Sequence, residues 1–378
     1  MKKSTVGAYG GWLARLAEKP GPLSFLNRRL HSPADWRSAV RPRVIARLNP
    51  PDAGGTPRVR VIEKYEWEGL HIERLEWRLP YGPPTSALFL KPAGYAERLP
   101  AVLALHCHGG NKYLGWEKIA RGRRPPTRML RWHVNHYYGG VFWANELARR
   151  GYAVLAPDAY AFASRRVRTA DVLDRVRGGA PSADPVTERD IRRYNDWAAG
   201  HANVMAKALF AAGTTWPGVV LAEDRKALDV LCARPDVDRE RVGCGGLSGG
   251  GLRTVYLAGL DYRVKCAVCV GYMTTWRDMA VNQCWTNTWM VNTAILPGEM
   301  DFPEILGMRA PLPTLVMNDK KDQLYNLGEM RRADRILGGI YRKARASDRY
   351  RCSYYPGFHK FDLPMQSEAF DWYDRWLK

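Results

Sequence analysis

The residues best suited to chemistry lie around Ser248, in the sequence Gly-Leu-Ser-Gly-Gly at 246–250. The pattern at 241–245 predicts a strand before this serine, and a helix pattern starts near Gly251. A serine on a tight strand-to-helix turn projects its hydroxyl away from the sheet. Such a turn needs small residues two before and two after the serine, because backbones come into contact there. The helix start adds free N–H groups and a positive dipole end. We therefore predict that Ser248 is a nucleophile.

A serine nucleophile needs a general base, and the base needs an acid that orients it. His359 is the only histidine after the nucleophile, and it follows the last predicted strand. The acid is expected after the predicted strand at 313–317, where Asp319 and Asp322 are the candidates. We prefer Asp322, because the orienting acid usually lies on the loop a few residues beyond the strand. Asp319 is then a turn residue.

The oxyanion of an acyl-transfer reaction needs two hydrogen-bond donors. One predicted donor is the backbone N–H of Gly249, directly after the nucleophile. The other is expected from the loop after the predicted strand at 101–105, where Gly110 is the first choice and Asn111 the second. Loss of one such donor typically costs about 3 kcal/mol of transition-state stabilisation.

Three long intervals follow predicted strand ends and are expected to cover the site as loop insertions, at about 111–138, 159–217 and 273–310. Residues in and near these intervals are candidates for the substrate pocket, namely His108, Asn111, Tyr160, Trp276, Trp285 and Trp289. Large aromatic side chains after a strand end can enclose a sugar ring or an acyl chain. Alternatively the tryptophans anchor a long loop on the core, and the sequence favours neither interpretation.

Two groups of residues could instead form a metal or redox site. They are four histidines and a C-x-x-C pair: His106, His108, His133, His136, Cys266 and Cys269. No carboxylate pairs with the histidines, and the cysteines fall in a predicted buried strand without a second ligand pair. We expect these side chains to pack or to line a cavity, and we predict no metal and no cofactor.

The elements that position these residues change character along the chain. Segments 59–67, 71–79 and 85–90 have strand patterns separated by turn residues, which predicts antiparallel pairing. After them, strand and helix patterns alternate. We therefore predict an α/β fold with a mostly parallel central sheet, antiparallel N-terminal strands and helices on both faces. Ligands bind such sheets beyond the carboxyl ends of the strands, where the candidate residues fall.

The first 55 residues have a different pattern. Ser32 can cap a helix that has Pro33 at its first position and Trp36, Val40 and Val44 at helical spacing. We expect residues 1–55 to form a helical accessory segment and residues 56–378 to form the catalytic domain.

Composition limits the class of protein. The 378 residues are 46% hydrophobic and 25% charged, which is ordinary for a globular chain and excludes global disorder. No apolar run approaches the length of a membrane span. The seven scattered cysteines and an N-terminus without an apolar stretch after Lys3 favour the cytoplasm over secretion.

The net charge of +20 attracts polyanions, but the basic residues are spread along the chain. We therefore prefer a diffuse arginine-rich surface over nucleic-acid binding. No membrane partner is expected, and a homo-oligomer is left open.

Several stretches together resemble the α/β-hydrolases of the dienelactone-hydrolase and acetyl-xylan-esterase type. The similarity runs from about residue 100 to the C-terminus, and its carriers are LHCHGG at 105–110, WANELARRGYAVLAPD at 143–158, DVLCARPDVDRERVGCGGLSGG at 229–250, PLPTLVMNDKKD at 311–322 and YPGFH at 355–359. The resemblance implies an α/β-hydrolase fold. It also implies a nucleophile, acid and base at Ser248, Asp322 and His359, with oxyanion amides at Gly249 and Gly110.

Two departures from this pattern bear on the substrate. Dienelactone hydrolases have cysteine where this chain has Ser248, which favours ordinary ester hydrolysis over enol-lactone opening. Secreted acetyl xylan esterases carry signal peptides, whereas the N-terminus here favours a small or oligomeric intracellular ester, of acetyl or another short acyl group on a sugar or uronic acid. The alternatives are a peptidase or carbon–carbon hydrolase with the same triad, or a noncatalytic polyanion-binding protein.

Overall fold

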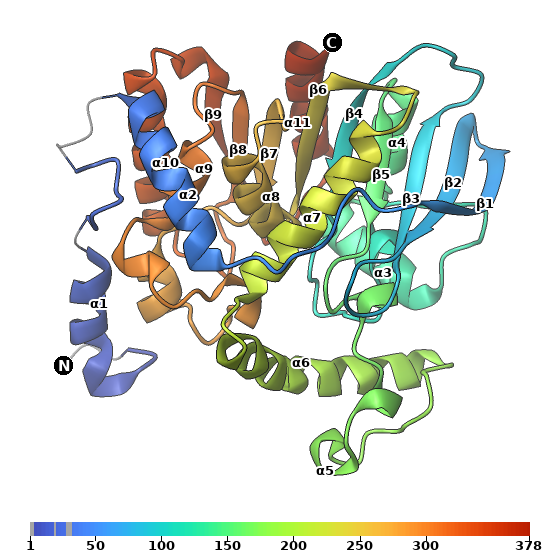
Figure 1. The fold of residues 1–378 in the computed structure, drawn as a ribbon, viewed down its shortest axis with the longest axis horizontal. Coiled ribbons are helices and arrows are strands. Elements are labelled where there is room, and N and C mark those ends of the chain that lie inside the picture. The colour runs from blue at the N-terminus through green and yellow to red at the C-terminus, as the bar shows by residue number, and fades with distance from the viewer. Residues whose placement is uncertain (1–3, 19, 28–31) are drawn as a thin grey trace.

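The computed structural model describes residues 4–18, 20–27 and 32–378 (Figure 1). In this part of the chain a single sheet has the strand order β1-β2-β3-β5-β4-β6-β7-β8-β9. The strands are β1 (Arg60–Trp67), β2 (Leu70–Trp77), β3 (Thr85–Pro92), β4 (Leu99–Ala104), β5 (Ala153–Pro157), β6 (Val237–Leu247), β7 (Cys266–Val270), β8 (Thr314–Asp319) and β9 (Tyr350–Tyr355).

The strand directions agree with the prediction of antiparallel N-terminal strands followed by parallel ones. The pairs β1–β2, β2–β3 and β3–β5 are antiparallel, whereas β5–β4, β4–β6, β6–β7, β7–β8 and β8–β9 are parallel. Parallel strands need crossover connections, and helices provide them here. The predicted α/β fold class is therefore confirmed.

Helices cover both faces of the sheet, and two apolar cores lie between the layers (Figure 1). One core takes side chains from α2, α7, α8, α9 and α10, and the other from α3, α4 and α11. The helices are α1 (Gly10–Glu18), α2 (Pro33–Leu48), α3 (Arg128–Tyr138), α4 (Trp143–Arg149), α5 (Asp174–Arg177), α6 (Glu188–Ala211), α7 (Trp216–Cys232), α8 (Gly249–Leu260), α9 (Phe302–Gly307), α10 (Leu327–Lys343) and α11 (Leu363–Leu377). Short 3-10 or π turns occur at Gly7–Tyr9, Trp116–Lys118, Ala163–Arg165, Thr169–Asp171, Asp278–Asn282, Trp289–Val291, Leu296–Gly298 and Ser347–Arg349.

The helix predicted after Ser32 is present as α2. The Ser32 hydroxyl accepts a hydrogen bond from the Asp35 N–H at 3.0 Å, as an N-cap does. Trp36 is fully buried, and its indole N–H donates to the Leu23 carbonyl at 2.7 Å. The apolar stripe of α2 thus belongs to the core that α7 and α8 share, although the boundary near residue 55 stays a prediction.

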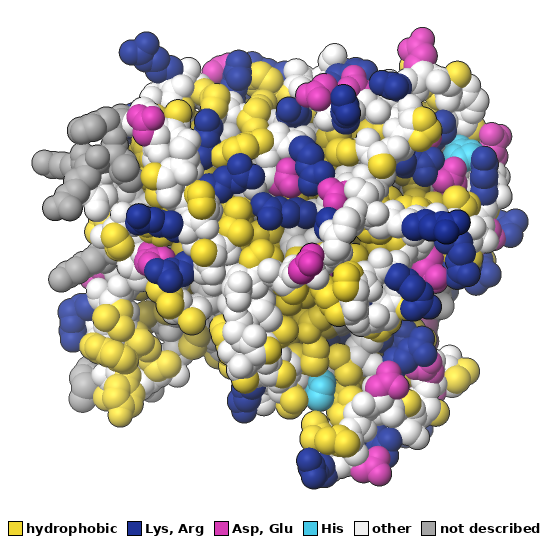
Figure 2. Space-filling model, in the orientation of Figure 1, with side chains coloured by type: hydrophobic (Ala, Val, Ile, Leu, Met, Phe, Trp, Pro, Cys, Tyr) yellow, Lys and Arg dark blue, Asp and Glu magenta, His cyan; other side chains and the backbone are white. Residues whose placement is uncertain are grey.

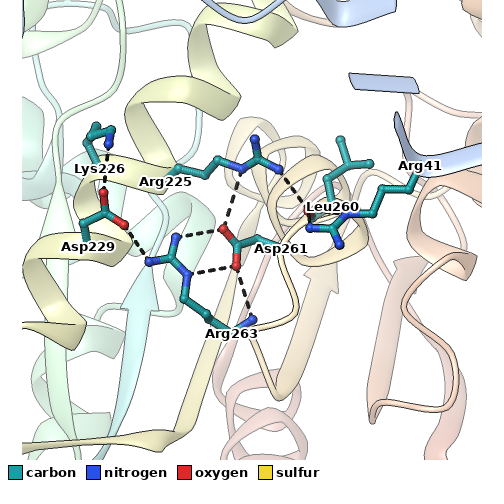
Figure 3. A network of polar contacts seen from close by, with 7 residues as sticks. All are labelled: Arg41, Arg225, Lys226, Asp229, Leu260, Asp261 and Arg263. Atoms are coloured by element: carbon teal, nitrogen blue, oxygen red, sulfur yellow. Dashed lines mark hydrogen bonds and ion pairs between the residues drawn. The ribbon is translucent and has the colours of Figure 1, made fainter. Parts of the chain in front are cut away.

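Polar contacts also attach α2 to α7 and to the end of α8 (Figure 3). Arg41 of α2 and Arg225 of α7 both donate to the carbonyl of Leu260, which ends α8, each at 2.9 Å. The next residue, Asp261, accepts from Arg263 at 2.8 Å and lies 3.6 Å from Arg225. The helix is therefore bound to the fold by hydrogen bonds as well as by apolar burial.

The three long intervals contain helices that the sequence analysis did not identify. The longest is α6, which lies across the lower end of the view in Figure 1, apart from the helices that flank the sheet. Its buried residues are Tyr194, Ala198, Ala202 and Ala206, spaced four apart. Three of these four are alanines, so the helix shows no stripe of large apolar residues, which is the usual signal in a sequence.

The surface carries basic side chains across the face shown in Figure 2 without gathering them into one stripe. Among the described residues, no single helix has the length and apolar composition of a membrane span, although α6 and α7 meet that test together across a bend of 87°. Cys266 and Cys269 are buried in β7, as the strand prediction required.

Candidate active site

Ser248 lies between the end of β6 and the start of α8, on the predicted turn. Its backbone has φ 60° and ψ −118°, which is a strained conformation for a residue with a side chain. The Ser248 N–H donates to the Val270 carbonyl at 2.8 Å, which holds the turn against the end of β7. With 9% of its surface exposed, the residue keeps some access to solvent.

The two flanking glycines are required by close backbone contact. A Cβ atom at Gly246 would lie 2.0 Å from the Leu105 carbonyl oxygen, and one at Gly250 would lie 2.1 Å from the same atom. Real Cβ atoms do not approach backbone oxygen so closely. The motif therefore allows the turn to pack on the segment that leaves β4.

His359 and Asp322 form a buried pair. The imidazole Nδ1 lies 2.6 Å from the Asp322 Oδ2, and the other carboxylate oxygen accepts from the Leu324 N–H at 2.8 Å. The ring lies over Gly271, where a Cβ would be 2.9 Å from the His359 Cε1. Gly271 directly follows β7, the strand paired with β6, so the ring is held above the strand ends beside the serine turn. Within the described chain, His359 Nε2 is buried and has no hydrogen-bond partner.

Asp319 takes a different position at the end of β8. Its Oδ2 accepts from the backbone N–H of Lys360 at 3.0 Å, so it holds the segment next to His359 rather than the ring. Burial raises the pKa of Asp319 to about 7. Of the two candidate acids, the structure brings Asp322 to the imidazole.

The amides of the loop after β4 are arranged differently from the sequence prediction. The N–H of Gly110 donates to His108 Nδ1 at 3.1 Å, and the N–H of Asn111 donates to the His108 carbonyl at 3.1 Å. The N–H groups of both candidates on this loop, Gly110 and Asn111, are thus already bonded within the loop. A Cβ on Gly249 would lie 3.0 Å from the backbone nitrogen of His108, and within the described chain that N–H has no acceptor. The available pair of amides is Gly249 and His108, which corrects the choice of Gly110.

The His108 side chain suits this arrangement. Burial, with the charges of Lys112 and Lys118, lowers the pKa of His108 well below its ordinary value. The neutral ring can accept at Nδ1, as the bond from Gly110 requires. The ring also packs edge-on against Phe162, with ring centroids 5.2 Å apart.

A cavity of about 390 Å³ lies against this loop. Its lining includes Gly109, Gly110 and the predicted pocket residue Asn111, together with Trp132 of α3 and Asn195 of α6. The last two were not predicted, because the helices that carry them were not identified in the sequence.

The other predicted pocket residues lie elsewhere. Trp276 is buried against Phe302, with ring centroids 5.0 Å apart, so it anchors its loop on the core. Tyr160 packs against Trp216 at 5.4 Å, and Trp285 is 75% exposed, while Trp289 is partly exposed. None of these four lines the cavity beside the loop.

A larger cavity of about 630 Å³ is lined by chain neighbours of the residues that line the smaller one. Tyr113, Leu114, Thr127 and Leu130 line it, whereas their chain neighbours Asn111, Arg128 and Met129 line the smaller cavity. Six arginines and four carboxylates also line the larger cavity: Arg74, Arg121, Arg123, Arg124, Arg166 and Arg168 with Glu63, Glu76, Glu117 and Asp158. The two cavities are therefore lined by neighbouring residues of the same two segments, 111–114 and 127–130.

Two of the four histidines considered as metal ligands, His106 and His133, are buried and packed, whereas His136 is exposed. His106 Nδ1 contacts the Cys107 carbonyl at 3.0 Å, and its Nε2 accepts from the Ala159 N–H at 3.2 Å. His133 lies 3.3 Å from the Cys107 sulfur, and burial lowers the pKa of His133 to about 3. Among the described residues, no group of three or more His, Cys, Asp or Glu side chains could hold a metal ion.

The sheet order, the turn after β6 and the acid and histidine after β8 and β9 define an α/β-hydrolase fold. No family model matches the chain. A curated protein of Bacillus subtilis (strain 168), named "Putative hydrolase YtaP", is 25% identical over 292 residues, which cover 77% of this chain and 83% of that protein.

Solved structures with this fold cover nearly the whole chain. One described as a putative acetyl xylan esterase, from Bacteroides fragilis, has a TM-score of 0.67 at 18% identity and covers 93% of this chain and 82% of its own. A glucuronoyl esterase from Solibacter usitatus has a TM-score of 0.62 at 14% identity, covering 94% and 96%. At these identities the likeness establishes the fold.

Proposed function

We propose that this protein is a serine hydrolase that cleaves carboxylic esters through Ser248, His359 and Asp322. The observation that carries the proposal is the strained serine turn beside a buried His359–Asp322 pair with a free Nε2. A strained backbone at a nucleophile is retained where the surrounding structure holds the reactive group in place.

In the first half of the reaction, His359 Nε2 takes the proton of Ser248 as the serine oxygen attacks the ester carbonyl carbon. The carbonyl oxygen becomes an oxyanion, which accepts from the N–H groups of Gly249 and His108. When this intermediate collapses, the alcohol leaves with the proton from His359. Asp322 keeps the imidazole in one orientation and stabilises its cation.

In the second half, water replaces the alcohol. His359 takes a proton from the water as its oxygen attacks the acyl carbon of the acyl-serine. Collapse of the second tetrahedral intermediate returns that proton to Ser248 and releases the carboxylic acid. The net reaction is ester plus water to alcohol plus acid, and no cofactor is consumed.

The alcohol part of the substrate is proposed to be a sugar. The cavity beside the loop combines the broad face of Trp132 with polar groups from Asn195 and Asp196, which is a suitable lining for a sugar ring. The name of one similar structure, a putative acetyl xylan esterase, also points to a carbohydrate alcohol, whereas in the name glucuronoyl esterase the sugar is the acyl part.

We further propose that the sugar carries an acidic group. In the described chain Arg121, Arg124 and Arg168 of the larger cavity form no ion pair with a carboxylate. The charges that line the smaller cavity cancel, because it has two arginines, Arg128 and Arg192, and two carboxylates, Glu188 and Asp196. An oligosaccharide with its ester at Ser248 and a sugar ring in the smaller cavity would extend past residues 111–114 to place a carboxylate among these arginines.

Hydrolysis of p-nitrophenyl acetate by wild type and Ser248→Ala tests the proposal. We expect the variant to lose several orders of magnitude in kcat with an unchanged circular dichroism spectrum, because the nucleophile alone is removed. A surface control, Ser367→Ala, should retain wild-type kcat. If folded Ser248→Ala remained active, or wild type cleaved no ester among acetyl, longer acyl and sugar substrates, the proposal would be abandoned.

A further inference from the structure

Lys118 is a lysine without any solvent exposure, located in the short turn Trp116–Lys118. Its ammonium donates to three backbone carbonyls, those of Cys107 at 3.0 Å, His108 at 3.0 Å and Asn111 at 2.5 Å. All three carbonyls belong to the loop that presents the His108 amide. A single side chain therefore uses all of its donors to close this loop.

Within the described chain no carboxylate forms an ion pair with this ammonium, although the charges of Glu117 and Asp158 favour its protonated form. Five other lysines of the described chain form ion pairs, but Lys118 forms none. Apart from the three carbonyls, it faces the ring of Phe162 at 4.9 Å. Burial of an unpaired charge costs free energy, so a merely structural role would be served better by a neutral donor.

One of the three hydrogen bonds acts on the proposed oxyanion donor directly. The Cys107 carbonyl and the His108 N–H belong to the same peptide group. A cation at the carbonyl oxygen polarises that group and makes its N–H a stronger donor, because linked hydrogen bonds reinforce each other at low dielectric. We call this arrangement the relay: the Lys118 ammonium, the peptide group between Cys107 and His108, and the His108 N–H that lies beside Gly249, where negative charge develops.

We propose that Lys118 is a positioning residue of the oxyanion hole, which holds the loop 107–111 and strengthens the His108 N–H as a donor through their shared peptide. This inference rests on the proposed esterase function, because it requires an oxyanion at that amide. In the ground state no carboxylate forms an ion pair with the buried ammonium, whereas in the transition state negative charge develops at the amide that Lys118 polarises. Lys118 should therefore act on kcat more than on KM.

The protonation of Lys118 provides an independent measure. Burial lowers the pKa of Lys118 to about 8, so the side chain loses its charge within an accessible range of pH. The titratable and charged groups that face it are Cys107, His106 and His108 on the loop, Glu117 on its own turn, Lys112, His133 on α3, Asp158 after β5 and Arg253 on α8. We expect kcat to fall as pH rises above about 8, because the charged form is the active one.

Lys112 is a matched control. It is also a buried lysine, and burial lowers its pKa to about 8, but its ammonium donates to the Ala198 carbonyl of α6 at 3.3 Å instead of to the loop. It lies in neither of the two cavities. Lys118→Met and Lys112→Met thus remove similar charges, and only the first breaks the relay.

The experiment measures kcat and KM for p-nitrophenyl acetate from pH 6 to 10 in wild type, Lys118→Met, Lys118→Arg and Lys112→Met. We expect Lys118→Met to lower kcat about 100-fold with KM within about 3-fold, and to abolish the fall in kcat above pH 8. Lys118→Arg should restore part of kcat without that fall, since its charge persists. Lys112→Met should lower kcat far less than Lys118→Met and should keep the fall, because the hydrogen bonds from Lys118 to the loop remain.

Several results would overturn this inference. They are a folded Lys118→Met with kcat within 3-fold of wild type, an equal loss in Lys112→Met, or a high-pH fall that survives in Lys118→Met. If Lys118→Met does not fold, Lys118→Gln takes its place, and a folded Lys118→Gln with kcat within 3-fold of wild type rejects the inference. A wild type without esterase activity would reject the proposed function as well, whereas an active wild type with unaffected Lys118 variants rejects the relay alone.

Discussion

The Asp322 carboxylate lies 2.6 Å from Nδ1 of His359, and both side chains are buried at the carboxyl end of the sheet. The second oxygen of Asp322 is held by the Leu324 N–H, so the carboxylate has one orientation toward the ring. Asp319 lies only three residues earlier, but its carboxylate accepts from the backbone of Lys360. The two acids, one at the end of β8 and one on the loop after it, thus have separate tasks.

Substitution of the two acids should separate these tasks. Asp322→Asn is expected to lower kcat/KM for p-nitrophenyl acetate by about 10⁴-fold, because an amide cannot stabilise the imidazolium or enforce its tautomer. Asp319→Asn should lower it less than about 10-fold, since an amide oxygen can still accept from Lys360. Equal losses in the two folded variants would contradict the assignment of Asp322.

The N-terminal helix should contribute strongly to stability. Trp36→Ala removes a fully buried indole from the core beneath α2 and should lower the free energy of unfolding by about 3–5 kcal/mol. Trp285→Ala is the matched control, because that side chain is 75% exposed and its loss should change stability by less than about 0.5 kcal/mol. Urea unfolding measures both. Similar effects of the two substitutions would mean that α2 packs on the core only weakly.

Glu304 is expected to make stability depend on pH. Its carboxylate accepts from Ser24 at 2.8 Å, from the Phe25 N–H at 2.6 Å and from the Asp301 N–H at 2.7 Å, and so attaches the N-terminal segment to α9. Burial raises the pKa of Glu304 to about 7. Because the folded state holds this proton more tightly than the unfolded chain, stability is complete below about pH 4.5 and falls as pH rises toward 7.

The contribution of Glu304 can be isolated with Glu304→Gln. From pH 4.5 to 7 the wild type should lose about 3 kcal/mol of unfolding free energy through this group. The variant should lack this slope and start about 1 kcal/mol lower, since one hydrogen bond to the Asp301 N–H is lost. Urea midpoints at several pH values provide the measurement, and parallel curves for the two proteins would exclude the effect.

The proposed acidic substrate can be tested at the larger cavity. Arg124→Gln with Arg168→Gln removes two of its unpaired cations. We expect kcat/KM for an acetylated uronic-acid oligosaccharide to fall about 5- to 10-fold, while the neutral acetylated xylo-oligosaccharide is unaffected. The loss should shrink at high salt, which screens exposed charges. Equal effects on both substrates, or none, would remove the reason for proposing an acidic sugar.

Much of the fold could be predicted from local patterns in the sequence. The strands around Val102, Val154 and Val268 are short apolar runs bounded by turn residues, and their alternation with helices implies the parallel sheet. The serine turn was recognisable because the requirement for small residues is local. The helix α6 was not, because alanines at Ala198, Ala202 and Ala206 give little hydrophobic contrast.

What the sequence by itself determined is therefore the order of the elements and the set of candidate side chains, since Ser248 and His359 have no competitors in their segments. Only the tertiary structure decided which acid meets the histidine, which amide beside Gly249 is free and which lysine is buried behind it. These choices depend on whether a donor or acceptor is already occupied by a partner far away in the chain. No local pattern contains that information, because each partner is brought into contact only when the loops close over the ends of the strands.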